Sequence, residues 1–334
     1  MACEAAFNQN KSREIMKKLG IFLLLIALTA CSEELEIIIP AKEPSLVVYS
    51  IIRPFAYSNT EQQYIKLQST SHIFDTASNE ICDAQVLYYE NDLLKDTLSF
   101  STNVQAYLIS PNISDFPIEG NSYSIVVQKP GFKSVSANTF IPSQVKIIDT
   151  LVSPVAYFDE DGLVYSEIQF SFEDPAEEIN YYEVAVSKLG ASNADSGDFY
   201  ELTTNDNLIL SESYYPSLIR FDLDKPKNLL FSDKSINGKK HTLTMYYFPP
   251  QRESEKLYIG SHYLSIHLRN ITEDYFKFKT TMIQHLNSKE EDILHGTGEP
   301  INVISNINNG FGLFSGYNED IASLHIDSLI VSMK

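Results

Sequence analysis

The stretch VYSEIQF, residues 164–170, alternates in a way that decides the fold class. In an extended chain, Val164, Ile168 and Phe170 fall on one face, while Glu167 and Gln169 fall on the other. A period of two with one apolar face is typical of a half-buried β-strand. The stretch therefore predicts a strand that covers a core with one face and meets solvent with the other.

Similar runs of valine, isoleucine, tyrosine and phenylalanine recur along the chain, and glycine, proline, asparagine and aspartate separate them. They are residues 46–49, 84–89, 123–127, 182–186, 243–247 and 263–268. The chain has no tryptophan, so its 20 tyrosines and 19 phenylalanines must supply the large core side chains, and we expect the excess of tyrosine at sandwich surfaces and rims. The pattern predicts an all-β fold built from sandwiches.

The segment IALTACSEE, residues 26–34, ends a short apolar run at a cysteine and then turns acidic. Lys17 and Lys18 precede the run, which is too short for a membrane-spanning helix of about 20 residues. A basic start, a short apolar stretch and small residues before a cleavage point are typical of a signal peptide. We therefore expect residues 1–30 to be a signal peptide.

The residues LTAC at 28–31 resemble the bacterial lipobox, in which the cysteine receives diacylglycerol and becomes the first residue of the mature chain. Cys31 is thus the predicted lipidation site; an ordinary secretory signal with an unrelated cysteine is the alternative. Residues 1–15 are polar and lie upstream of the basic start, so we expect translation to begin at Met16.

The residues SEELE at 32–36 resemble the acidic tag that directs lipoproteins of the Bacteroidota to the cell exterior. A solvated linker with glutamates is the alternative, and the two interpretations are compatible. We expect residues 31–44 to form a lipid-anchored linker and the protein to sit in the outer membrane, facing outward.

The predicted mature chain is strongly acidic. Four basic and two acidic residues precede Cys31, so 21 basic and 42 acidic residues remain, a net charge of −21. Such a chain does not bind nucleic acid through its phosphates, because that needs a basic surface. Anionic headgroups would also repel it, so the lipid on Cys31 must hold it at the membrane.

The 304 residues from Cys31 to the end are enough for two domains of ordinary size. We place the boundary near residues 142–154 and expect sandwich domains at residues 45–148 and 149–334. Two long polar stretches, residues 187–214 and 222–241, interrupt the second domain, and loops of that length are often functional or mobile.

One segment breaks the β pattern. The sequence TEDYFKFKTTMIQHLNS, residues 272–288, predicts a helix because Thr272 can cap it and two acidic residues follow at its positive end. Tyr275, Met282 and Leu286 fall on one face. We expect this stripe to dock on the second sandwich; a helix that binds a partner is the alternative.

Glycine and proline mark three predicted features. Residues 130–131, Pro-Gly, predict a turn, and residues 237–238, Asn-Gly, predict a hairpin. Residues 306–316 are rich in asparagine and glycine, which favours a tight corner before a last strand at 323–331 or a close approach of the backbone to a neighbour or ligand.

No motif in the sequence indicates catalysis or a cofactor. The nearest approach to a nucleophile elbow, residues 312–316, has its serine one position late. His262 and His267 are five residues apart, which in a strand places them on opposite faces and makes them a poor metal pair. Residues 159–162 have the acidic start of a calcium loop without its later ligands, so we expect a hairpin turn. We interpret Cys82 as a small buried core residue.

Five segments, taken in order, resemble one known family. They are the lipobox with the acidic residues and residues 44–48; residues 120–127, 129–132 and 137–142; residues 229–245; residues 273–276; and residues 302–318. The chain is similar in these segments to the Bacteroidota outer-membrane lipoproteins known as domain of unknown function 4249. Residues 120–127, 129–132 and 137–142 resemble the C-terminal part of a transthyretin-like or carboxypeptidase-regulatory sandwich domain.

The resemblance implies a function beyond the fold. Members of the family are commonly encoded beside TonB-dependent outer-membrane receptors, which implies an accessory role in nutrient uptake. We therefore expect two tandem sandwiches of immunoglobulin or transthyretin-like type, no enzymatic activity, no metal, no cofactor, and a TonB-dependent receptor as partner. Peptide, glycan and metal-chelate ligands are all compatible with the composition. The alternatives are a surface hydrolase with a site built from loops, and a structural or adhesion lipoprotein.

Overall fold

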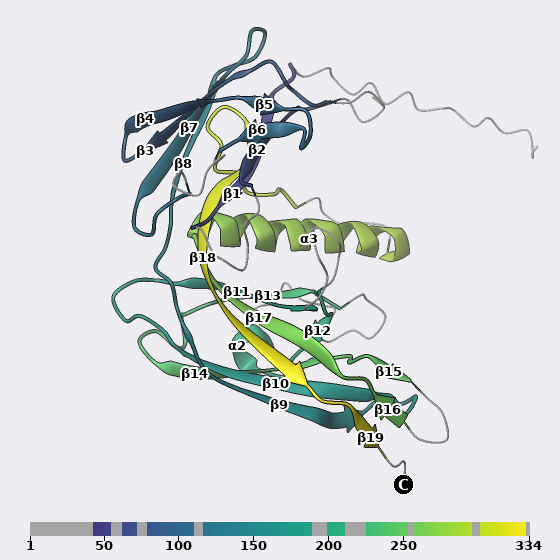
Figure 1. The fold of residues 1–334 in the computed structure, drawn as a ribbon. Helices are drawn as coiled ribbons and strands as arrows, with labels where there is room; N and C mark the ends of the chain where they lie inside the picture. Colours follow the sequence, from purple (N-terminus) through teal and green to yellow (C-terminus); the bar gives the residue numbers. More distant parts are fainter. Residues whose placement is uncertain are drawn as a thin grey trace, which may run out of the picture. The chain divides into compact units, whose positions relative to one another are not determined.

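A computed structural model describes residues 43–54, 62–71, 79–109, 116–188, 199–210, 225–252, 257–295 and 301–331. Its strands are β1 (Leu46–Ile52), β2 (Tyr64–Ser69), β3 (Gln85–Glu90), β4 (Leu93–Leu98), β5 (Phe100–Ser101), β6 (Ala106–Leu108), β7 (Ser122–Gln128), β8 (Val135–Phe140), β9 (Ile147–Phe158), β10 (Val164–Glu173), β11 (Tyr181–Lys188), β12 (Leu202–Thr203), β13 (Asn228–Ser232), β14 (Lys240–Tyr247), β15 (Gln251–Arg252), β16 (Leu257–Ile259), β17 (His262–Ile271), β18 (Phe311–Ile326) and β19 (Leu329–Val331). Its helices are α2 (Asn207–Leu210) and α3 (Glu273–His295). The prediction of an all-β fold with one docked helix is confirmed (Figure 1).

The first sandwich encloses a core of its own. One layer holds β18, β1, β2, β6 and β5 in that order, and the other holds β4, β3, β7 and β8. Alternate residues of β1, β3 and β7 are buried, as a period of two requires. Val48, Val86 and Ile125, all fully buried, lie in this core. Gly131 has φ +88° at the turn from β7 to β8, where the amide of Phe132 donates to the carbonyl of Lys129, so the predicted turn is confirmed.

The second sandwich follows the same plan. One layer holds β13, β11, β17 and β18, and the other holds β12, β14, β10 and β9. The stretch that predicted the fold is β10, and its Val164, Ile168 and Phe170 are at most 1% exposed, as expected. A small third sheet of β15, β16 and β19 packs Leu257 and Ile259 against Val164.

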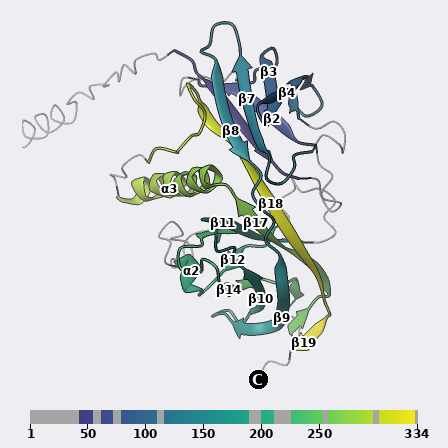
Figure 2. The same ribbon diagram turned by 90° about the vertical axis from the view of Figure 1, so that its left-hand side faces the viewer.

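Strand β18 belongs to both sandwiches. Its first part pairs in parallel with β1, from Val47 opposite Phe311 to Ile52 opposite Gly316. Its second part pairs antiparallel with β17, from Ile271 opposite Tyr317 to His262 opposite Ile326. Figures 1 and 2 show this strand in yellow, running without interruption from β1 to β19. The division of the chain at residues 148 and 149 stays a prediction; in space, β18 contributes to both cores.

Glycine makes the pairing of β18 with β1 possible. Gly312 has φ +110°, and a β-carbon there would collide with the carbonyl oxygen of Val48. A β-carbon on Gly316 would collide with the carbonyl of Phe140 in β8. The run at 306–316 thus lets one strand lie against the backbone of its neighbours, which is one of the two predictions made for it. The other prediction was a tight corner before a last strand at 323–331. A turn is present, but the strand that follows it, β18, begins at Phe311, so the predicted strand limits were wrong.

Helix α3 begins where the sequence predicted and runs seven residues longer. The amide of Tyr275 donates to the Thr272 hydroxyl over 3.4 Å, so Thr272 is the cap. Tyr275 is 3% exposed, and Phe276 and Ile283 pack against the second core, which confirms the docking. Leu286 is 52% exposed, so that end of the predicted stripe is not buried.

The predicted Asn-Gly hairpin at 237–238 was wrong. Gly238 does form a turn with φ +68°. The strands on either side, β13 and β14, lie in different sheets, because β13 pairs with β11 and β14 pairs with β10. The Gly238 amide donates to Asp174 over 2.9 Å, so the turn is fixed to the end of β10 while the chain crosses between layers.

Candidate functional site

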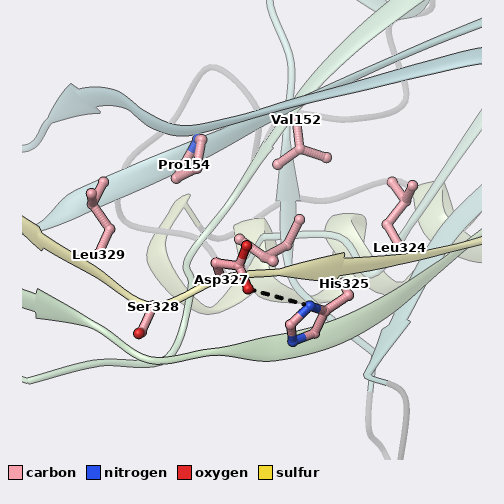
Figure 3. A pocket seen from close by; sticks show the side chains of 8 residues that line it. Val152, Pro154, Leu324, His325, Asp327, Ser328 and Leu329 are labelled. Carbon is pink, nitrogen blue, oxygen red and sulfur yellow. Dashed lines mark ion pairs between the residues drawn. The ribbon is translucent and has the colours of Figure 1, made fainter.

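An open pocket lies where β18 ends. Val152 and Pro154 of β9 form one side, and the end of β18, the link at 327–328 and Leu329 of β19 form the rest (Figure 3). Its volume is about 380 Å³. Most of the lining is aliphatic, and His325, Asp327 and Ser328 supply the polar groups. Pockets of this size and composition bind small molecules or single side chains of a partner.

His325 contacts three polar or aromatic side chains at the pocket. Its Nε2 lies 2.9 Å from the Ser261 hydroxyl, and its Nδ1 lies 3.5 Å from Asp327 (Figure 3). Tyr263 packs on the imidazole with ring centroids 4.4 Å apart. The order serine, histidine, aspartate is that of a hydrolytic triad. The side chains of His325 and Asp327 are 41% and 94% exposed, so water competes for the contact that would orient the imidazole.

The spacing of His325 and Asp327 in the sequence is a local signal for the contact between them. His325 and Asp327 are two residues apart at the end of a strand, which directs both side chains to the same side. Ser261 precedes β17, whose first residue lies opposite Ile326. Only the pairing of β17 with β18 brings the serine to the histidine, and local sequence does not reveal that pairing.

A second group of polar side chains is buried where α3 covers the sheet. We call Glu183, Arg269, Glu319 and His267 the charge network. Arg269 contacts Glu183 at 2.8 Å and Glu319 at 3.2 Å, and His267 contacts Glu319 at 3.3 Å. The hydroxyl of Tyr275 on α3 donates to Glu183 over 3.0 Å. The network therefore joins β11, β17, β18 and α3.

Burial and pairing act in opposite directions on the acids of the charge network. Burial alone would raise the pKa of Glu319, but the hydrogen bond from His267 and the charge of Arg269 lower that pKa to about 2. Burial would likewise raise the pKa of Glu183, but the charge of Arg269 outweighs burial. The pKa of Glu183 is therefore lowered. Both carboxylates are therefore charged at neutral pH, and a buried pair of this kind is costly to break.

The Ser187 hydroxyl lies 2.8 Å from His267 Nε2, so this network also contains a serine, a histidine and an acid in sequence. The oxygen of Glu319 that accepts from His267 is the one that contacts Arg269. An imidazolium would thus share its counter-ion with a permanent cation, which weakens the assistance a base requires. We interpret the network as structural: it fixes α3 to the sheet.

Several predicted residues can now be placed. Cys31 and the acidic residues after it lie outside the described residues. Cys82 is exposed, so its prediction as a core residue was wrong; the buried neighbour is Ile81, at 7% exposure. His262 bonds the hydroxyl of Tyr247 over 2.8 Å while His267 belongs to the charge network, so the two do not meet.

The acidic loop at 159–162 is a hairpin turn between β9 and β10, as predicted. Asp159 accepts from the amides of Asp161 and Leu163, and Gly162 takes φ +79°. Its carboxylate thus satisfies the backbone. Of the two long polar stretches, the described parts hold β12, α2 and β13.

In the ranges given above, no three acidic, cysteine or histidine side chains are grouped closely enough to hold a metal ion. Within the same part of the chain, no helix has both the length and the apolar character to cross a bilayer.

Residues 32–322 match the family described as Domain of unknown function (DUF4249). The chain belongs to this family. The resemblance found in the sequence is thereby confirmed. The match covers the charge network but ends before His325, so the polar lining of the pocket lies beyond the residues matched to the 4249 family.

Other comparisons add little. No curated protein matches the chain. A crystal structure of Parabacteroides merdae β-glucuronidase is similar at 10% identity, over 68% of this chain and 23% of that one, with a TM-score of 0.18. The chain thus spans less than a quarter of that enzyme, and the likeness carries no argument about fold or activity.

Proposed function

We propose that this member of the 4249 family is a lipoprotein of the outer membrane that faces the cell exterior and serves a TonB-dependent receptor as a binding or accessory subunit. The lipobox at Cys31 and the acidic residues after it support the anchoring and the orientation. The family resemblance supports the receptor. The net charge of −21 in the mature chain disfavours attachment of the protein surface to anionic headgroups, so the lipid on Cys31 would hold the protein at the membrane.

The observation that carries a binding role is the open pocket at the end of β18. Its aliphatic lining offers apolar area, and its few polar groups can orient a ligand. Leu329 and Ile330 of β19 are 40% and 61% exposed, so apolar surface extends beyond the pocket. Surfaces of this kind mark contacts with a ligand or a partner protein.

The anchoring is tested by a Cys31→Ser variant. The unchanged protein should take up labelled fatty acid, fractionate with the outer membrane and be digested by protease added to whole cells. The variant should lose the label and leave the membrane. Equal membrane retention of both proteins would overturn the lipid anchor, and protection of the unchanged protein from protease would overturn surface exposure.

The pocket is tested in living cells with a photo-reactive amino acid. At Leu329 it should crosslink to a TonB-dependent receptor. The matched control is Leu93 on β4, which is 75% exposed and belongs to the other sandwich. Crosslinks from Leu93 and none from Leu329 would show that the receptor contacts a different surface.

A hydrolase is the second candidate, because Ser261, His325 and Asp327 stand in the order of a triad beside the pocket. In that reaction the serine oxygen attacks an ester carbonyl while the imidazole takes its proton. A fluorophosphonate probe discriminates between the two functions. Labelling that is lost in Ser261→Ala would support the hydrolase, and its absence would support binding alone.

A further inference from the structure

A row of aromatic rings lies on the second sandwich, and none of these rings lines the pocket. We call Tyr157, Tyr165, Tyr246 and Phe248 the aromatic row. Tyr157 and Tyr165 stack with centroids 5.0 Å apart and planes 4° from parallel. Tyr246 meets Tyr157 edge-on at 5.4 Å, and Phe248 meets Tyr165 edge-on at 5.6 Å. The four rings therefore form one continuous cluster.

The row is on the outer face of its sheet. In β10 the residues Ile168 and Phe170 point into the core, so Tyr165 and Glu167 point away from it. Tyr157 lies opposite Tyr165 across the pairing of β9 with β10. Tyr157 and Phe248 are 39% and 41% exposed, so ring surface is open to a partner.

Carboxylates surround the rings. Glu167 lies opposite Tyr246 in the pairing of β10 with β14. After burial, Glu167 is the main cause of the raised pKa of Tyr246. Burial, Tyr157, Asp159 and Glu201 together raise the pKa of Tyr165. The acids are close enough to act on the hydroxyls, and the phenols stay neutral at physiological pH.

Among the described residues, no ion pair joins Asp159, Glu167 or Glu201 to a lysine, arginine or histidine. Glu183 of the same sandwich, by contrast, is paired with Arg269. The aromatic row thus combines partly exposed rings with carboxylates that have no ion-pair partner among the described residues.

We propose that the aromatic row binds the ammonium or guanidinium groups of a cationic segment of a partner protein. A cation gains from the exposed parts of the rings, such as those of Tyr157 and Phe248, and from the carboxylates together. Uncompensated acids also steer a cationic partner toward this face over a longer range. A neutral ligand would gain from the rings alone and would leave the repulsion among the acids unrelieved.

This inference goes beyond the proposed function. None of the rings lines the pocket at the end of β18. The row therefore offers a second contact surface, with a different chemistry, and it holds whether or not the partner is a receptor.

The test measures peptide binding to the purified full lipoprotein in a nonionic detergent. The probes are a hexa-arginine peptide and its hexa-citrulline counterpart, which keeps the shape and lacks the charge. Arginine peptide should bind, and citrulline peptide should bind at least tenfold more weakly. Phe248→Ala and Tyr157→Thr should each weaken binding about two- to fivefold. Glu167→Gln should weaken it at low salt and have little effect at high salt.

Matched controls separate the row from the net charge of the protein. Glu178→Gln removes one exposed acid, and Phe140→Ala removes a ring that is 48% exposed on β8 of the first sandwich. Both should bind the arginine peptide like the unchanged protein. Equal losses in controls and row variants would overturn the proposal, as would equal binding of both peptides. Circular dichroism confirms that each variant is folded.

Discussion

Among the glycines at positive φ, Gly312 is the one whose replacement by alanine should destabilise the protein most. The φ of +110° costs an alanine about 1–3 kcal/mol. The new methyl would also collide with the carbonyl of Val48, a backbone atom that cannot rotate away. Relief requires β18 to move off β1, which loosens the fully buried Phe314 and forfeits about half of the 3–5 kcal/mol that such a ring contributes. The expected loss is about 3–5 kcal/mol in total.

Gly131 supplies the matched control. Its φ is +88°, and nothing lies within 4 Å of a β-carbon built there. Gly131→Ala should therefore cost only the conformational part, about 1–3 kcal/mol. Both variants are compared with the unchanged protein by urea unfolding, followed by circular dichroism and by tyrosine emission. Losses that agree within about 0.5 kcal/mol would refute the claim that close contact between β18 and β1 needs glycine.

Three further predictions concern other parts of the fold. Because the pKa of Glu319 is about 2 when folded and near 4.5 when unfolded, protonation of this group alone should cost the protein about 3 kcal/mol of stability as pH falls from 5 to 2. Other acids with a lowered pKa, such as Glu183, add to the loss. Glu319→Gln should reduce the pH dependence of stability in urea titrations by about the share of Glu319, and an unchanged slope would contradict the pairing with Arg269. Thr272→Ala should cost about 1–2 kcal/mol, measured in the same way, through loss of the cap of α3 and of the bond to Ser315. Cys82 should react with a thiol reagent in the folded protein, and reaction only after denaturation would contradict its exposure.

The strands were predictable because their signal is local. The alternation in residues 164–170 is a property of one strand, and burial at Ile168 and Phe170 followed from it. The same reasoning failed on β11, where Glu183 sits at a position expected to meet solvent. Helix α3 covers that face, and Glu183 is fully buried. Which face of the sheet the helix covers depends on segments about 90 residues apart, as the hydrogen bond between Tyr275 and Glu183 shows. The alternation of residues within one strand does not contain this information.

The tyrosines show a similar limit. Their excess indicated sandwich rims, yet Tyr123, Tyr182 and Tyr247 are fully buried. Each hydroxyl finds a partner inside, such as Asp174, which accepts from Tyr182 over 2.5 Å. A buried phenol is acceptable when its hydroxyl is bonded, and the partners come from other strands or loops, so composition could not reveal them.

The candidate sites were missed for the same reason. The sequence places Tyr165 and Glu167 on the same face of β10. The aromatic row also needs rings from β9 and β14, and only the pairing of the strands brings these together. The triad order at His325 needs Ser261, which is 64 residues away. Cys31, by contrast, was predicted from residues next to it, because a transferase and a peptidase read a continuous segment.

The most direct test of the proposed receptor complex is to purify the protein through a C-terminal tag from gently solubilised membranes of its host. The receptor and the lipoprotein in the eluate are then quantified by mass spectrometry. The account predicts a TonB-dependent receptor at near-equal amounts, reduced by Leu329→Asp and unaffected by Leu93→Asp. Recovery of the lipoprotein alone, under conditions in which other receptor complexes survive, would contradict it.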